Sequence, residues 1–152
     1  MLGKRISLLA IAGVVAAGAA WAHGGATGVV KERMDAMSAI GKNMKSVGQM
    51  LKTSPDIDPV LVANAGEAIA SHSGQALIKL FPEDSLKAPS EASPAIWTDW
   101  NKFSDYADGL QASALGMKSL AEQGADKKSV AAAFGKVAAT CKSCHEAFRI
   151  KK

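Results

Sequence analysis

The chain has 152 residues, of which 48% are hydrophobic and 5% aromatic, and its formal net charge is +4 at pH 7. This length suits a single domain. Basic residues are not interleaved with aromatic ones, which argues against nucleic-acid binding. Alanine is frequent and favours helices, because it loses no side-chain entropy in them.

Residues 1–22 have the features of a cleaved signal peptide. Lys4 and Arg5 precede an apolar run, and Ala20-Trp21-Ala22 has small residues at the two positions that signal peptidase reads. The run is short for a membrane-spanning helix, which needs about 20 apolar residues. We therefore expect cleavage rather than an anchor, leaving a domain of residues 23–152 that is exported to the periplasm and does not span the membrane.

A first helix is predicted over residues 27–52. Its inward stripe alternates steps of three and four residues, the pattern of a helical-bundle seam. The stripe consists of Val30, Arg33, Met37, Ile40, Met44, Val47 and Leu51. Gly41 and Gly48 lie beside this stripe, which suggests that a bulky group approaches the helix backbone there.

Two further helices are predicted in the middle of the chain. Asp58-Pro59 provides a cap and a first-turn proline for a second helix that extends to about Leu80. A polar loop over residues 83–92 follows. Ser93-Pro94 then repeats the same start for a third helix, which Gly124 ends.

Asp126 is predicted to cap the last helix. The inward stripe of this helix is Val130, Phe134, Val137, Cys141, Cys144 and Phe148. Both cysteines are therefore expected to face the core. Four amphipathic helices with three connections predict an all-α fold, an antiparallel up-down-up-down four-helix bundle.

The sequence Cys141-Lys142-Ser143-Cys144-His145 has the C-x-x-C-H spacing of a c-type haem attachment site. Two thiols one helical turn apart can add to the two vinyl groups of one porphyrin, and the next residue supplies an axial imidazole. A redox dithiol would normally sit in a βαβ unit, and a zinc site would need a second ligand pair. The sequence has neither feature, so we predict one covalent haem c. No paired catalytic groups stand out, and we do not expect an enzyme.

On these residues the chain resembles the class II c-type cytochromes, the cytochrome c′ and cytochrome c-556 family. The matching features are the C-terminal motif with Phe148 and Arg149, Ile96-Trp97 after Ser93-Pro94, Leu80-Phe81-Pro82, and the spacing of Arg33 and Met37. The resemblance implies a haem between the helices, with its distal face covered by the first helix. It also implies electron transfer to transient redox partner proteins, by a monomer or by a homodimer formed through the first two helices.

In this family the sixth position of the iron is either empty, so that it binds NO or CO, or filled by a methionine sulfur. The corresponding residue here is Met37. Residues 37–44 and 93–97 resemble the low-spin members, so we predict axial ligation by His145 and Met37 in a one-electron carrier. The alternative is a five-coordinate cytochrome c′ in which Met37 only fills the core. Met34 is an alternative sulfur.

Two arginines are candidates for the haem edge. Arg33 is a charge in an apolar stripe and needs a partner, which a haem propionate would supply. Its alternative is a guanidinium that extends to solvent over a buried stem. Arg149 lies four residues after His145, and the resemblance implies a place near the proximal histidine. Alternatively, Arg149 is only a cation at the C-terminus of the helix, where the helix dipole favours a positive charge.

Overall fold

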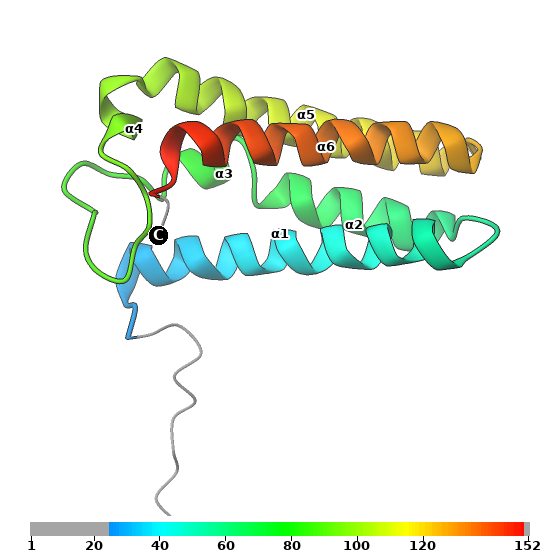
Figure 1. The fold of residues 1–152 in the computed structure, drawn as a ribbon, viewed down its shortest axis with the longest axis horizontal. Helices are drawn as coiled ribbons and strands as arrows, with labels where there is room; N and C mark the ends of the chain where they lie inside the picture. The colour runs from blue at the N-terminus through cyan, green and yellow to red at the C-terminus, as the bar shows by residue number, and fades with distance from the viewer. Residues whose placement is uncertain (1–24, 151–152) are drawn as a thin grey trace, which may run out of the picture.

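The computed structural model describes residues 25–150, which contain six helices (Figure 1). The helices are α1 (Gly28–Thr53), α2 (Pro59–Ser71), α3 (Gln75–Ile78), α4 (Ala95–Thr98), α5 (Trp100–Glu122) and α6 (Lys127–Phe148). The predicted signal peptide lies outside the described residues. Within the described part, none of these helices is both long and apolar enough to cross a membrane.

The four long helices α1, α2, α5 and α6 run alternately in opposite directions (Figure 1). This arrangement confirms the predicted up-down-up-down bundle. The short α1–α2 and α5–α6 turns share one end of the bundle. The long connection between α3 and α4 lies at the other end, beside the start of α1 and the end of α6.

The predicted caps and stops of the long helices are confirmed. The Asp58 carboxylate accepts a hydrogen bond of 3.0 Å from the backbone N–H of Leu61, with Pro59 in the first turn of α2. The Asp126 carboxylate accepts one of 2.7 Å from the N–H of Ser129. Gly124 follows α5 with a φ of 72°, a left-handed conformation that glycine adopts without strain.

The prediction that the second helix continues to about Leu80 is wrong, because α2 ends at Ser71. Gly74 has a φ of 56°, and its backbone N–H donates to the carbonyl of Ala107 in α5 at 3.0 Å. The Ser73 hydroxyl donates to the carbonyl of Ile69 at 2.7 Å. These hydrogen bonds replace those of a continuous helix, and the short α3 follows the break.

The third helix starts where it was predicted but is interrupted. The Ser93 hydroxyl accepts from the N–H of Ala95 at 3.2 Å, which supports the start of α4. Asp99 then leaves the helical region with a φ of −132° and a ψ of 51°, and α5 begins at Trp100. The sequence between Ser93 and Gly124 therefore forms two helices rather than one.

Two clusters of buried side chains form the interior. The bundle core is shared by the four long helices. It consists of Ile40, Val47, Met50, Val62, Ala65, Ile69, Ala70, Leu110, Ala114, Met117, Ala121, Val130, Ala133 and Val137. The aromatic cluster fills the end with the long connection. It consists of Leu77, Ile78, Phe81, Ile96, Phe103, Ala107 and Phe148. The Phe103 ring centroid lies 4.7 Å from that of Phe81 and 5.6 Å from that of Phe148.

Candidate haem site

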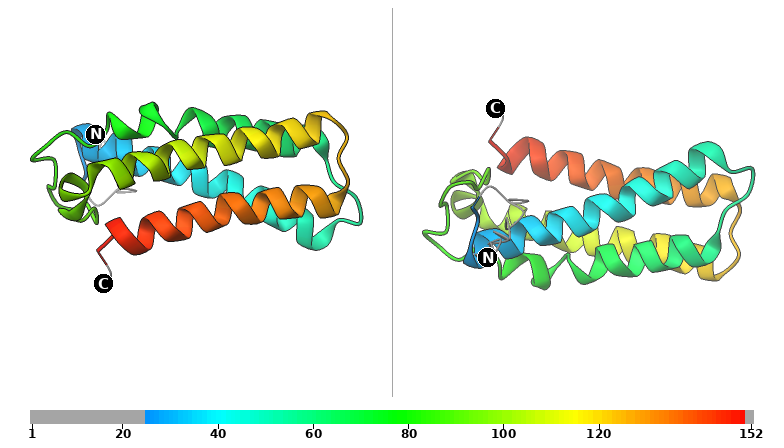
Figure 2. Two further views of the ribbon diagram at one scale, coloured as in Figure 1. Left: turned by 90° about the horizontal axis from the view of Figure 1, so that it is seen from above. Right: turned by 90° about the horizontal axis from the view of Figure 1, so that it is seen from below.

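The last turns of α6 carry the C-x-x-C-H motif at the end of the bundle with the long connection. Seen from below, α1 and α6 cross near the short turns and diverge toward this end (Figure 2). Near the crossing, Phe134 of α6 packs against Gly48 of α1. The Lys127 ammonium also donates there to the carbonyl of Ser54. The motif therefore lies where α1 and α6 are farther apart.

Cys141 and Cys144 are both free and half-buried. They are three residues apart on α6 and so lie on one face, about one turn apart. Cys141 packs against the bundle core, and Cys144 packs against the aromatic cluster. The predicted orientation toward the interior is correct, and the two thiols lie at the boundary between the two clusters.

The surroundings of the motif favour the uncharged forms of its side chains. Burial raises the pKa of Cys141, and it raises the pKa of Cys144 to about 11, so both side chains are neutral thiols at pH 7. Desolvation, and then the nearby charge of Arg149, lower the pKa of His145. The neutral imidazole that this favours has a free nitrogen lone pair, which is the form that binds a metal.

Met37 lies on α1 at the level of the motif. It is half-buried and packs against both the bundle core and the aromatic cluster. These are the two clusters that Cys141 and Cys144 contact. Met44 packs against the bundle core alone, so it lies farther from the motif end. The structure thus places Met37 nearer the boundary between the clusters than Met44.

The two glycines beside the predicted stripe of α1 differ. A Cβ atom at Gly48 would lie 3.3 Å from Cζ of Phe134, so an α6 side chain is the bulky group that approaches there. A Cβ atom at Gly41 would meet nothing within 4 Å. Gly41 is exposed, so one turn beyond Met37 this side of α1 faces solvent.

Arg33 is buried, with 5% of its surface exposed, and its guanidinium binds the connection between α3 and α4. Nε and Nη2 donate to the carbonyl of Leu80 at 3.1 and 2.9 Å. Nη2 also donates to the Ser85 hydroxyl at 2.8 Å, and Nη1 donates to the Ser90 hydroxyl at 3.2 Å. The guanidinium carbon lies 4.1 Å from the centroid of the Phe81 ring. This burial excludes the alternative in which Arg33 extends to solvent, and the propionate contact stays a prediction.

Arg149 is exposed and directly follows α6. Its Nε donates to the Glu91 carboxylate at 2.8 Å, and its backbone N–H donates to the carbonyl of His145 at 3.1 Å. Its charge contributes to the lowered pKa of His145, which places it near the motif. The partners of the two arginines, Ser85, Ser90 and Glu91, were not predicted from the sequence. Polar residues in a loop carry no sequence signal of what they contact.

The alternative uses of the motif find no support in the described part of the chain. Residues 25–150 contain no strand, only an isolated β-bridge between Ala92 and Arg149, so a βαβ context is absent there. The same residues contain no group of three His, Cys, Asp or Glu side chains placed to hold a metal ion.

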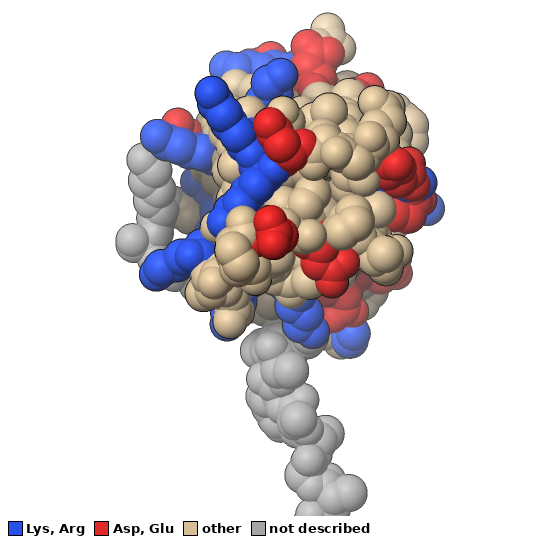
Figure 3. Space-filling model, turned by 90° about the vertical axis from the view of Figure 1, so that its right-hand side faces the viewer, with Lys and Arg blue, Asp and Glu red and all other residues tan. Residues whose placement is uncertain are grey.

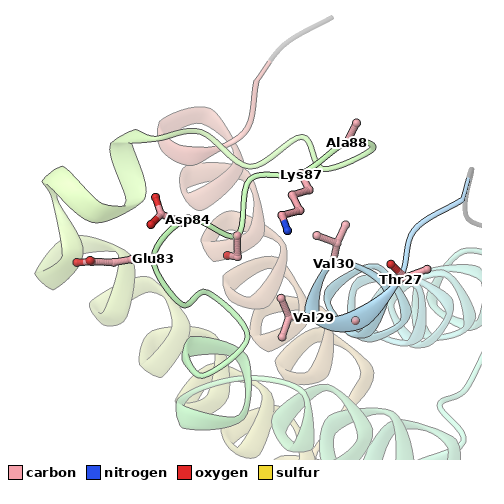
Figure 4. Close-up of a pocket in the computed structure, with 9 residues that line it drawn as sticks. Thr27, Val29, Val30, Glu83, Asp84, Lys87 and Ala88 are labelled. Atoms are coloured by element: carbon pink, nitrogen blue, oxygen red, sulfur yellow. The ribbon is translucent and has the colours of Figure 1, made fainter.

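A hollow of about 300 Å³ lies between the start of α1 and residues 83–88 of the connection (Figure 4). The two cysteines, His145 and Met37 are not among its lining residues. It is therefore separate from the candidate haem site.

The residues present fit a c-type haem. The site combines two free thiols one turn apart, a neutral imidazole next to them and a methionine on another helix at the same level. Together with the four-helix bundle, these features define a c-type cytochrome with its attachment motif near the C-terminus.

The chain belongs to the cytochrome c′ family, whose model matches residues 28–149. Members of this family carry one covalently bound haem c, and so does this chain. The attachment of that haem at Cys141 and Cys144, with His145 as axial ligand, stays a prediction.

Three relatives illustrate the range of the family. Cytochrome c′ of Rhodopseudomonas palustris is 34% identical over 149 residues, covering 97% of this chain and 99% of the relative. Its solved structure has a TM-score of 0.75 at 35% identity, covering 84% of this chain and 99% of that one. A cytochrome c-556 of Agrobacterium tumefaciens is 34% identical over 125 residues, covering 82% of this chain and 99% of the relative. A nitric oxide complex of a mutant cytochrome c′ from Alcaligenes xylosoxidans has a TM-score of 0.72 at 27% identity, covering 82% and 94%.

Proposed function

We propose that the chain is a periplasmic cytochrome c′ whose iron is held by His145 and keeps its sixth position open to NO or CO. We propose a gas-binding and electron-transfer role rather than an enzymatic one. The likeness to cytochrome c′ of Rhodopseudomonas palustris over nearly the whole chain carries the proposal. The nitric oxide complex of a relative of the same kind supports it. When bound, haem c supplies an iron that exchanges one electron and can bind a diatomic gas.

The motif residues would hold the haem and set its proximal side. The thiols of Cys141 and Cys144 would each add across one vinyl group, and the resulting thioether bonds would fix the haem on α6. Burial of both thiols keeps this region apolar. His145, in its neutral form, would bind the iron. Its position next to Cys144 in the sequence makes the two contacts part of the same helical turn.

On the distal side, Met37 would be a packing residue. Its contacts with both core clusters give the side chain a place without a bond to iron. Methionine fills such irregular sites well because it is unbranched and flexible.

A low-spin electron carrier with Met37 bound to iron is the second candidate. The identity of 34% with a cytochrome c-556 favours it. The level of Met37 on α1, at the boundary between the clusters, is compatible with both candidates. The two differ in whether the sulfur reaches the iron.

The charge distribution suggests the kind of redox partner. Exposed lysines lie on α1 and α6, the helices that carry Met37 and the motif: Lys42, Lys45, Lys52, Lys128, Lys136 and Lys142. Most exposed acidic residues of the long helices lie on α2 and α5: Glu67, Asp105, Asp108 and Glu122. Glu32 of α1, Glu146 of α6 and Lys102 of α5 are exceptions to this separation. Seen from the end with the short turns, basic side chains are more frequent on the left and acidic ones on the right (Figure 3). A transient partner with an acidic surface would therefore approach the α1–α6 side.

The spectrum of the natively exported protein tests the proposal. We expect a high-spin visible and EPR spectrum for the oxidised protein, and ready CO binding by the reduced protein. A methionine-to-iron charge-transfer band together with a low-spin EPR signal would instead establish the second candidate.

Met37→Ala, with Met44→Ala as its matched control, identifies the role of the sulfur. Both methionines are half-buried on α1, but only Met37 packs against both clusters. If Met37 is a packing residue, both variants keep the high-spin spectrum. Conversion from a low-spin to a high-spin spectrum in Met37→Ala alone would show that Met37 is an iron ligand.

A further inference from the structure

The connection between α3 and α4 contacts both helices that flank the candidate haem site. We call residues 80–93 the strap. It crosses the motif end of the bundle between the start of α1 and the end of α6 (Figure 1). Arg33 of α1 and Arg149, which directly follows α6, hold it.

The first anchor joins the strap to α1. The buried guanidinium of Arg33 donates to the Leu80 carbonyl and to the hydroxyls of Ser85 and Ser90. The Ser85 hydroxyl in turn donates to the carbonyl of Pro82 at 2.6 Å. Hydrogen bonds to a buried charged group are among the stronger ones in proteins. This anchor therefore restrains the strap from its first residue to Ser90.

The second anchor joins the strap to the end of α6. The Glu91 carboxylate accepts from Nε of Arg149 at 2.8 Å. The backbone N–H of Ser93 donates to the carbonyl of Phe148, and that of Ile150 donates to the carbonyl of Glu91, both at 2.8 Å. These bonds surround the isolated β-bridge between Ala92 and Arg149. The last residues of the strap and the end of α6 therefore form one hydrogen-bonded unit.

Between the anchors, the strap does not pack closely on α1. The hollow of about 300 Å³ separates residues 83–88 from the first turn of α1. In Figure 4, Lys87 extends toward Val29 and Val30, while Glu83 and Asp84 point away. On this side, polar bonds from Arg33 hold the strap, and apolar contact contributes less.

The anchors lie at matching places on the two helices. Arg33 is four residues before Met37, and Arg149 is four residues after His145. Four residues of a helix rise about 6 Å. Each anchor is thus about one turn from a residue of the proposed haem site, Met37 or His145.

We propose that the strap sets the separation of α1 and α6 at the haem, and thereby whether the Met37 sulfur reaches the iron. Arg33 and Glu91 are then positioning residues that act through the two helices. The inference rests on the haem site proposed above. Loosening either anchor changes the ratio of high-spin to low-spin iron in the holoprotein.

The test compares two strap variants with a control. Ser85→Ala/Ser90→Ala removes two hydroxyl partners of Arg33 and keeps the buried charge itself. Glu91→Gln weakens the second anchor. The control, Glu67→Gln, weakens an ion pair of 2.8 Å to Lys118 that joins α2 and α5 outside the strap. The readouts are the ferric EPR spectrum and the hydrogen exchange of the Ser93 and Ile150 amides.

We expect the spin ratio to change about tenfold in Ser85→Ala/Ser90→Ala, because bonds to a buried charge are lost. In Glu91→Gln we expect the two amides to exchange about two- to fivefold faster, because an exposed ion pair contributes little to stability. We expect the spin ratio to change less than in Ser85→Ala/Ser90→Ala. The control should match the wild-type protein in both readouts.

Two results would overturn the inference. In the first, a strap variant exchanges its amides faster than the control but has the same ratio of high-spin to low-spin iron as the control. The other is unchanged exchange in Glu91→Gln, which would show that this pair does not anchor the strap. A low-spin wild-type spectrum would defeat the open sixth position alone. The strap variants would then gain high-spin iron instead of low-spin iron, and the inference would stand.

Discussion

Two helix pairs of the bundle are built in opposite ways. Where α2 packs on α5, a Cβ atom at Gly66 would lie 2.8 Å from both the carbonyl oxygen of Ala114 and Cβ of Lys118. On α1, which faces α6, a Cβ atom at Gly41 would meet nothing within 4 Å. Gly66 is buried between the two helices, whereas Gly41 is exposed. The first pair is closed by backbone contact at Gly66, and α6 does not cover α1 at Gly41.

Further polar contacts join α2 and α5 along their length. The Gln111 side chain donates to the carbonyl of Ala70 at 3.3 Å, and Lys118 pairs with Glu67 at 2.8 Å. The contacts described above between α1 and α6, at Gly48 and Ser54, lie at the end with the short turns. The described contacts thus hold α2 and α5 together along their length, whereas those between α1 and α6 lie at one end.

The largest expected effect is the loss of the covalent haem when both thiols of α6 are removed. We expect Cys141→Ala/Cys144→Ala to lose the covalent haem completely, because no thiol then remains to bond the vinyl groups. The mass of the intact exported protein measures this directly. Ser143→Ala, within the same motif, is the control and should keep the haem mass. Retention of that mass by the double alanine variant would contradict the proposed attachment.

The two glycines offer a matched pair of substitutions. Gly66→Ala should destabilise the protein by about 1–3 kcal/mol, because the new Cβ must displace backbone atoms of α5. Gly41→Ala should stabilise the haem-free protein by about 0.5–1 kcal/mol, because alanine is the better helix former and meets open space. Urea unfolding of the two haem-free variants measures both free energies. Equal effects would show that the two helix pairs are packed alike.

The smallest expected effect is a pH dependence at the cap of α6. Hydrogen bonds from Ser129 lower the pKa of Asp126, so the folded state favours its charged form. This contribution to stability is present above the ordinary pKa of an aspartate, about 3.9, and is lost as the pH falls through the lowered folded value. Thermal unfolding of the wild-type protein and of Asp126→Asn between about pH 2 and pH 6 should show it.

Asparagine keeps an acceptor for the cap but carries no charge. The difference in Tm between the two proteins should therefore shrink at the acidic end of this range. A constant difference would mean that the charge of Asp126 adds nothing to the cap.

Local signals predicted the parts of the fold that depend on neighbouring residues. The caps at Asp58 and Asp126 and the stop at Gly124 were correct because each acts within one helical turn. The breaks at Gly74 and Asp99 were missed. At Gly74 the backbone bonds to Ala107, a residue of another helix, so the sequence around the break could not reveal that partner.

The predicted inward stripe of α1 was only partly correct, because burial also depends on the neighbouring helices. Val30, Arg33, Ile40 and Val47 are buried as expected, whereas Met37 and Met44 are only half-buried. Ala36 and Met50 are buried instead. The periodicity indicated which side of α1 faces inward. It did not show how far α6 lies from that side at each level.

The sequence by itself determined the haem motif. Cys141, Cys144 and His145 lie within five residues of one helix, so the geometry of that helix alone brings them together. Only the tertiary structure decided what Arg33 and Arg149 bind. Their partners Ser85 and Glu91 are 52 and 58 residues away along the chain. Contacts over such separations depend on how whole helices and the strap pack, and no local pattern of residues encodes them.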